Sequence, residues 1–192
     1  AGTGYSMVGI VSSTGGPQAL TQLLGALGPG FPLPILLVQH ITSSFLEGFV
    51  SWLSGVTPFQ VSIAKDDEEP QPGRVYMPSA DRHLVLRGGR LTLIDTPPVC
   101  SQKPSGSVLL ASLAKDTGRR GIGVVLTGMG ADGADGLLDM HKAGAHTIAE
   151  DESTCTVFGM PAAAQKLGAT REMLPLGDIA PRLKELAGGG KG

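Results

Sequence analysis

The feature that most constrains this fold is an apolar run near the start of the chain that ends in a turn and then a helix. Residues 8–11 read Val-Gly-Ile-Val, which is typical of a buried parallel strand. Pro17 suits a first helical turn, where its missing N–H is not needed. The turn between them places hydroxyl groups beside a helix N-terminus, where negative charge is stabilised. Ser13 in this turn is either a candidate nucleophile or only a helix N-cap.

Strands alternate with helices along the rest of the chain. Apolar runs at 35–38, 121–126 and 145–149 predict further buried strands of a parallel sheet with helices on both faces. Residues 83–94 alternate around a Gly-Gly pair, which is a hairpin signal. The predicted fold class is α/β, with a doubly wound, mostly parallel sheet, helices on both faces and one antiparallel hairpin at about 83–94. Weaker strands are expected at 60–64, 74–77 and near 173–176, and helices at 18–24, 108–115, 137–142, 162–167 and 179–187.

Length and composition suit one domain with a sizeable core, since the chain has 192 residues of which 41% are hydrophobic. We expect the domain at 7–187, a linker or remnant at 1–6 and a glycine-rich tail at 188–192. A net charge of −2 lacks the basic footprint of a nucleic-acid binder, and no run of about 18 apolar residues predicts a membrane span. Cys100 and Cys155 have neither disulfide-framework nor zinc spacing, which fits a reducing cytoplasm.

A helix is expected after the second strand. Ser44 and Glu47 have the spacing of a capping box, which predicts the start of this helix. A stripe of large apolar residues follows at helical spacing, and we interpret it as a core face. The stripe consists of Phe45, Phe49, Trp52 and Leu53.

Three residue types that serine hydrolases need follow buried strands of the predicted sheet. They are Ser13, His40 and Asp132. Parallel sheets bind ligands beyond the carboxyl ends of their strands, so these side chains are expected at one edge. Hydroxyl, imidazole and carboxylate there would form a nucleophile, its base and the group that orients the base. His83 is a second candidate base, while Cys155 is interpreted as a small buried hydrophobe.

A second motif overlaps this set. Residues 128–133 fit the pattern G-x-G-x-x-G between a strand and a helix, and Glu150 follows about 20 residues later, as in dinucleotide-binding domains. Against this interpretation, Asp132 would bring a carboxylate close to a pyrophosphate. The motif also starts two-thirds of the way along the chain, which leaves little sequence for a nucleotide-binding domain. A dinucleotide-binding, Rossmann-like domain therefore remains an alternative.

Four segments closely resemble the catalytic domain of CheB-type protein-glutamate methylesterases. The resemblance extends from about Val8 to Leu186, nearly the whole chain, and implies a Ser-His-Asp hydrolase on a doubly wound parallel sheet. The segments are Ser13-Thr14-Gly15-Gly16, Gln39-His40, Leu-Thr-Gly-Met-Gly-Ala-Asp-Gly at 126–133 and Val-Phe-Gly-Met-Pro at 157–161. The first and third together are highly specific.

The resemblance implies hydrolysis of γ-glutamyl methyl esters on the cytoplasmic helices of chemoreceptors, with release of methanol, and deamidation of receptor glutamines. By motif match, Ser13 is the nucleophile, His40 the base and Asp132 the orienting carboxylate. The implied partners are methyl-accepting chemotaxis receptors and, in the native system, a receiver domain or a signalling kinase. A cytoplasmic location is expected, without nucleic acid, membrane insertion, cofactor or metal. An inactive relative that only docks on receptors is a further alternative.

Backbone N–H groups near 14–16 and 129–130 are candidates for an oxyanion hole. The residues expected to line the site there are Thr14, Gly15, Gly16, Met129 and Gly130.

The chain departs from the family pattern in two places. Family members usually carry a receiver domain ahead of this one, whereas here six residues precede the first strand. The chain is therefore expected to be either a trimmed protein or a stand-alone member. The family's basic-Pro-Ser-x-Asp segment reads Lys-Pro-Ser-Gly-Ser at 103–107, so Ser107 stands where an Asp is expected.

Overall fold

The computed structural model describes residues 4–188. Within them, seven parallel strands form one sheet in the order β3-β4-β2-β1-β7-β8-β9, and a separate antiparallel hairpin pairs β5 with β6. This arrangement confirms the predicted α/β class with its doubly wound sheet and its hairpin. The strands are β1 (Met7–Ser12), β2 (Ile35–Gln39), β3 (Gln60–Ile63), β4 (Arg74–Met77), β5 (His83–Arg87), β6 (Arg90–Ile94), β7 (Gly121–Val125), β8 (His146–Glu150) and β9 (Glu172–Leu174).

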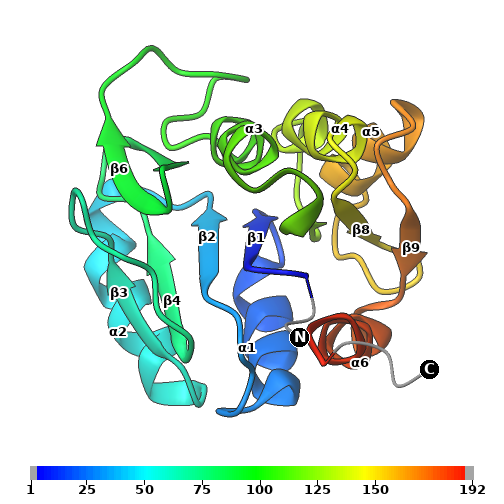
Figure 1. Cartoon of the computed structure of the whole chain (residues 1–192), viewed down its shortest axis with the longest axis horizontal. Helices are drawn as coiled ribbons and strands as arrows, with labels where there is room; N and C mark the ends of the chain where they lie inside the picture. Colours follow the sequence, from blue (N-terminus) through cyan, green and yellow to red (C-terminus); the bar gives the residue numbers. More distant parts are fainter. Residues whose placement is uncertain (1–3, 189–192) are drawn as a thin grey trace.

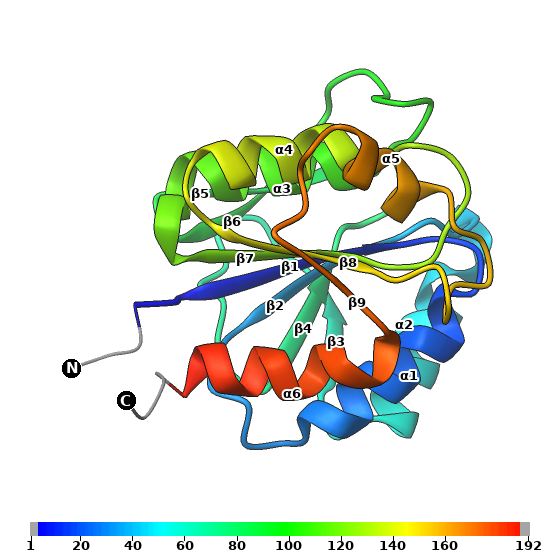
Figure 2. The same ribbon diagram turned by 90° about the vertical axis from the view of Figure 1, so that its right-hand side faces the viewer.

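Helices cover both faces of the sheet. Figure 2 views the sheet along its edge, with α1, α2 and α6 on one side and α3, α4 and α5 on the other. Side chains of β1 contribute to the hydrophobic cores on both faces of the sheet. Val8 and Ile10 face the layer of α1, α2 and α6, while Met7 and Val11 face the layer of α3, α4 and α5. The helices are α1 (Gly16–Leu27), α2 (Leu46–Val56), α3 (Gly106–Thr117), α4 (Ala134–Lys142), α5 (Met160–Lys166) and α6 (Leu176–Ala187).

The strand order reverses direction at β1, which lies at the centre of the sheet (Figure 1). From β1 the chain forms β2 beside it, continues to the edge strand β3 and returns to β4, which lies between them, before it crosses to β7 on the other side of β1. Such a switch point opens a crevice beyond the carboxyl ends of the central strands. The segments that follow β1, β2 and β7 therefore meet at one edge of the sheet.

Glycines let α3 approach β1 closely. A Cβ atom at Gly9 would collide with Leu113 of α3, and one at Gly106 would collide with Val11. The first turn of α3 therefore lies directly over the carboxyl end of β1. This contact brings the N-terminus of α3 to the edge where the three segments meet.

The start of α2 differs from the prediction. A 3₁₀ turn, Ser43–Phe45, precedes the helix, and no side chain caps it, so Ser44 and Glu47 form no capping box. The predicted core stripe is also half wrong. Phe49 and Leu53 are buried, but Phe45 and Trp52 are 66% and 44% exposed. Helical spacing fixes which residues share a face, but not how far the neighbouring layer reaches over it.

Two histidines outside the predicted site have structural contacts. His146 of β8 is buried, and its Nε2 lies 2.6 Å from Oε2 of Glu172 on β9. Arg182 of α6 donates from Nε to the same carboxylate at 2.9 Å. His141 contacts the Thr147 hydroxyl through Nδ1. None of the described helices has the length and apolarity to cross a membrane.

Candidate active site

The turn after β1 holds Ser13 at the start of α1. Gly15 has a φ of 84°, a left-handed conformation that a residue with a Cβ rarely adopts, so the turn requires glycine there. The carbonyl of Ser13 accepts the Gly16 N–H at 2.8 Å, and the N–H of Ser13 donates to the Thr127 carbonyl at 3.0 Å. The backbone of Ser13 is therefore fixed, while its side chain is partly exposed.

Gln39, the last residue of β2, stabilises this turn through hydrogen bonds of its side-chain amide. No sequence pattern indicated this role. Its Oε1 accepts the buried Ser12 hydroxyl at 2.5 Å. Its Nε2 donates to the carbonyls of Ser13 and His40 at 2.9 and 3.1 Å. A Cβ at Gly16 would collide with this amide, so the second glycine of the turn gives Gln39 its space.

His40 follows β2 directly and lies beside Ser13 on the neighbouring strand end. The register pairs Ser12 with Gln39, and the His40 N–H donates to the Ser12 carbonyl at 3.0 Å. Nε2 of His40 lies 2.6 Å from Oδ2 of Asp132, which comes from the loop after β7. The structure thus brings all three predicted residues to one edge of the sheet.

Asp132 is 2% exposed and is held at the N-terminus of α3. Besides His40, it accepts the Ser105 hydroxyl at 2.6 Å and the backbone N–H groups of Gly106 and Ser107 at 2.7 and 3.1 Å. Burial opposes its charged form, but the hydrogen bonds from His40, Ser105 and the two backbone groups outweigh it, so the pKa of this carboxyl is lowered. Asp132 is therefore an anion aimed at the imidazole.

Ser107 occupies the position where the family pattern has Asp. Its Oγ accepts the backbone N–H of Gly133 at 2.8 Å and that of Gly136 at 3.4 Å, at the start of α4. The hydroxyl thus satisfies donors at the helix start that a carboxylate could also satisfy. The substitution leaves the contacts of Asp132 intact, since only the backbone N–H of Ser107 reaches that carboxylate.

The imidazole of His40 is oriented with Nε2 toward Asp132, which leaves Nδ1 for the serine. Within residues 4–188, the Ser13 hydroxyl and Nδ1 make no hydrogen bond with each other or with other groups. Hydrogen bonds between nucleophile and base are often long in the absence of substrate. The chemistry available here is nucleophilic attack by a hydroxyl beside a base paired with a buried anion.

Unpaired backbone N–H groups flank Ser13. Within the described residues, the amides of Thr14, Gly15, Met129 and Gly130 donate no hydrogen bond, whereas that of Gly16 is already bonded to the Ser13 carbonyl. The N–H of Gly16 is therefore not free to act as a donor in the site. The loop that carries Met129 lies against the serine, because a Cβ at its neighbour Gly128 would stand 2.6 Å from the Ser13 Cβ.

The contacts of Glu150 do not fit the dinucleotide alternative. This carboxylate is fully buried, and its Oε1 accepts the Thr127 N–H at 2.9 Å, so it is not available to a ribose. Its Oε2 has no hydrogen-bond partner among the described residues. Nearby, burial and the negative charge of Glu150 raise the pKa of the Cys155 thiol to about 12, which fits the interpretation that this cysteine is not a nucleophile.

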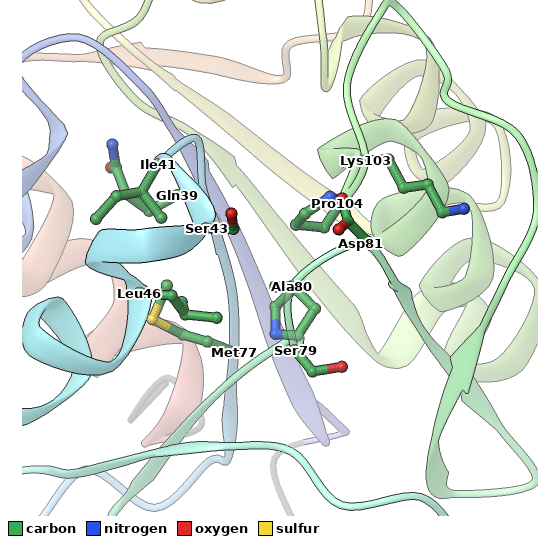
Figure 3. Close-up of a pocket in the computed structure, with 11 residues that line it drawn as sticks. Gln39, Ile41, Ser43, Leu46, Met77, Ser79, Ala80, Asp81, Lys103 and Pro104 are labelled. Atoms are coloured by element: carbon green, nitrogen blue, oxygen red, sulfur yellow. The ribbon is translucent and has the colours of Figure 1, made fainter.

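A pocket of about 120 Å³ lies between the segment that follows β2 and the segment that precedes α3 (Figure 3). Gln39 and Ile41, which flank His40 in the chain, form one wall, and Pro104, which precedes Ser105, lies across from them. A shallower apolar groove on α2, which includes Phe45 and Trp52, shares Ile41 with it. Among the described residues, no three His, Cys, Asp or Glu side chains are arranged to hold a metal ion.

Comparisons with known proteins point to one family. The family model described as CheB methylesterase matches residues 8–183. A protein-glutamate methylesterase/protein-glutamine glutaminase of Paramagnetospirillum magneticum is 67% identical over 187 residues, which cover 97% of this chain and 53% of the relative. FrzG of Myxococcus xanthus, a protein-glutamate methylesterase, is 43% identical over 182 residues, which cover 94% and 54%. The chain thus spans about half the length of these relatives.

One solved structure matches this chain over nearly the full length of both. The crystal structure of the Thermotoga maritima CheB methylesterase catalytic domain gives a TM-score of 0.90 at 35% identity, covering 95% of this chain and 98% of that one.

Proposed function

This chain belongs to the CheB methylesterase family, and on that premise we propose that it is a serine hydrolase that demethylates γ-glutamyl methyl esters of chemoreceptors. The observation that carries the proposal is the 2.6 Å contact between His40 and Asp132 beside Ser13, at the switch point of the sheet. The substrates proposed are methyl-accepting receptors on their cytoplasmic helices, so the enzyme acts in the cytoplasm. A receiver domain or a signalling kinase is the proposed regulatory partner.

In the first half of the reaction, Oγ of Ser13 attacks the ester carbonyl carbon while Nδ1 of His40 takes the hydroxyl proton. Asp132 accepts a hydrogen bond from the Nε2–H, keeps the ring in this orientation and stabilises the imidazolium that forms. Nδ1 then gives its proton to the departing methoxide, which leaves as methanol. The serine is left as a glutamyl ester, the acyl-enzyme.

Negative charge on the carbonyl oxygen is stabilised by the free backbone N–H groups around Ser13. Those of Thr14 and Gly15 belong to the turn before α1, and those of Met129 and Gly130 come from the opposite loop. Preorganised donors of this kind, removed one at a time, typically change kcat by about 10²–10³. The site thus has donors from two sides for the tetrahedral intermediate.

In the second half, water attacks the acyl-enzyme and gives a proton to Nδ1 of His40. Collapse of the intermediate returns that proton to Ser13 and releases the glutamate. A glutamine side chain fits the same sequence with ammonia as the leaving group, so deamidation is proposed as a second activity, which is also named for the relative in Paramagnetospirillum magneticum.

The direct test is methanol release from methylated receptor membranes by the purified chain. We expect release by the wild type and background release by Ser13→Ala, because the hydroxyl forms the covalent intermediate. Thr21→Ala is the matched control, since it also removes a hydroxyl near the start of α1 but one bonded within the helix. Wild-type protein that releases no methanol, or Ser13→Ala that keeps its activity, would contradict the proposal.

A further inference from the structure

His83 lies outside the Ser13–His40–Asp132 set but is joined to it through one residue. The imidazole is fully buried at the start of β5. Its Nδ1 accepts the backbone N–H of Ser105 at 3.0 Å, and its Nε2 lies 2.9 Å from the Pro97 carbonyl. Because a backbone N–H can only donate, Nδ1 must carry no proton, and Nε2 must carry one and donate it to Pro97. The two contacts fix one neutral tautomer.

The two hydrogen bonds of His83 hold both ends of the segment that connects β6 to α3. Pro97 lies shortly after β6, and Ser105 is the N-cap of α3, with its Oγ accepting the Val108 N–H. The same Oγ donates to Oδ1 of Asp132 at 2.6 Å. Ser105 is fully buried, so its N–H has no access to water and depends on His83 for a partner.

We propose that His83 is a positioning residue of the site, which holds Ser105 and the first turn of α3 where they clamp Asp132 against His40. The inference rests on the proposed function only in taking Asp132 and His40 as groups that activate Ser13. Of the four donors to Asp132, three come from Ser105, Gly106 and Ser107, the segment that His83 anchors. A shift of this segment moves the carboxylate, and with it the orientation of the imidazole.

Two uncharged variants distinguish a positioning role of the His83 imidazole from a role in packing alone. In His83→Asn the amide oxygen lies close to the position of Nδ1 and still accepts the Ser105 N–H. In His83→Gln the amide group lies close to the position of Nε2 and still donates to Pro97, but the acceptor for Ser105 is lost. A role in packing alone predicts that the larger Gln is tolerated at least as well as Asn.

The measurement is the rate at which a fluorophosphonate labels Ser13, because it needs an activated serine but no receptor substrate. We expect His83→Gln to lower this rate about 10- to 100-fold, the loss typical when a residue that orients a metal ligand is changed, and His83→Asn to label several-fold faster than His83→Gln. His141→Gln is the control histidine variant. On methylated receptors, kcat is expected to fall in His83→Gln with KM unchanged.

Equal labelling of His83→Gln and wild type overturns the inference, as does an equal loss in His83→Asn and His83→Gln. If His83→Gln does not fold, ¹⁵N chemical shifts of wild-type imidazoles decide, because a proton on Nδ1 of His83 contradicts the contact with Ser105. A wild type that labels at Ser13 but releases no methanol from receptors would refute the proposed function and leave this inference standing.

Discussion

Asp132 contacts His40 at Nε2, which leaves Nδ1 as the ring nitrogen for the proposed role of base. In the serine proteases the roles of the two ring nitrogens are reversed, with the carboxylate on Nδ1 and the serine on Nε2. The two residues reach each other from opposite sides of β1, since His40 follows β2 and Asp132 lies in the loop after β7.

Asp132→Asn is expected to abolish most of the turnover. Asn keeps the shape, but it removes the charge that stabilises the imidazolium and permits the wrong tautomer of His40. In serine proteases the equivalent change lowers kcat by about 10⁴, or roughly 5.5 kcal/mol of barrier. Methanol release measures the effect, with the melting temperature as a check on folding. A folded variant with more than about a tenth of wild-type turnover contradicts the orienting role of Asp132.

A serine-directed inhibitor is expected to label Ser13 and to spare Ser12. The two are adjacent in the chain, but Ser12 is fully buried and its hydroxyl is bonded to Gln39, whereas Ser13 is partly exposed beside His40. Peptide mass mapping after fluorophosphonate treatment locates the adduct. An adduct mainly on Ser12 or Ser43 would contradict the assignment.

Alkylation at about pH 8 is expected to modify Cys100 and to leave Cys155 intact. Cys100 is exposed, while burial and nearby carboxylates raise the pKa of Cys155 to about 12, so almost no thiolate is present. Iodoacetamide labelling followed by mass mapping tests this, and labelling in denaturant shows that both thiols are intact. Native Cys155 that reacts as fast as Cys100 would contradict the raised pKa of its thiol.

Ser107→Ala is expected to destabilise the fold by about 0.5–2 kcal/mol, the usual loss when a helix start loses its side-chain acceptor. The variant leaves the backbone N–H of Gly133 without the Ser107 oxygen. Urea unfolding measures the change. Ser107→Asp is the matched control, because it keeps an acceptor and restores the family pattern, and we expect it to retain the wild-type stability. Equal stability of Ser107→Ala and wild type would contradict the capping role.

Stability is expected to fall as the pH drops below about 6.5, in part through His146. Burial lowers the pKa of this histidine below its ordinary value, although Glu172 favours the charged form. In that range the unfolded chain binds a proton that the native protein does not, which favours unfolding. Urea unfolding between about pH 7.5 and 5 should give a flatter profile for His146→Gln than for the wild type. Parallel profiles would exclude His146 as the source.

The sequence was sufficient to predict the sheet and the three residues at its edge. Ser13, His40 and Asp132 each follow a buried run, and parallel strands present their carboxyl ends on one side, so proximity follows from topology alone. The ring orientation of His40 could not be predicted, because it depends on which neighbour approaches each nitrogen. The exposure of Phe45 and Trp52 depends in the same way on the layer beside α2, which periodicity does not describe.

The hydrogen bonds that hold Asp132 could not be predicted from the sequence either. Ser105 and His83 carry no motif that links them, and they lie 22 residues apart in the chain, with His83 at the start of the hairpin and Ser105 beyond its end. Only the close approach of α3 to β1, made possible by Gly9 and Gly106, brings this helix start to the carboxylate. Such a contact depends on the space between two elements, which residue spacing along one element cannot reveal.

The distance along the chain between the partners of the site has a consequence for refolding. His40 and Asp132 are 92 residues apart, so their contact forms only when strands from both halves of the chain have joined one sheet. Contacts between such distant segments form slowly, because closing a long loop costs entropy before the contact stabilises anything. After dilution from urea, helical circular dichroism is therefore expected to return first, and the reactivity of Ser13 reports when the two halves have joined.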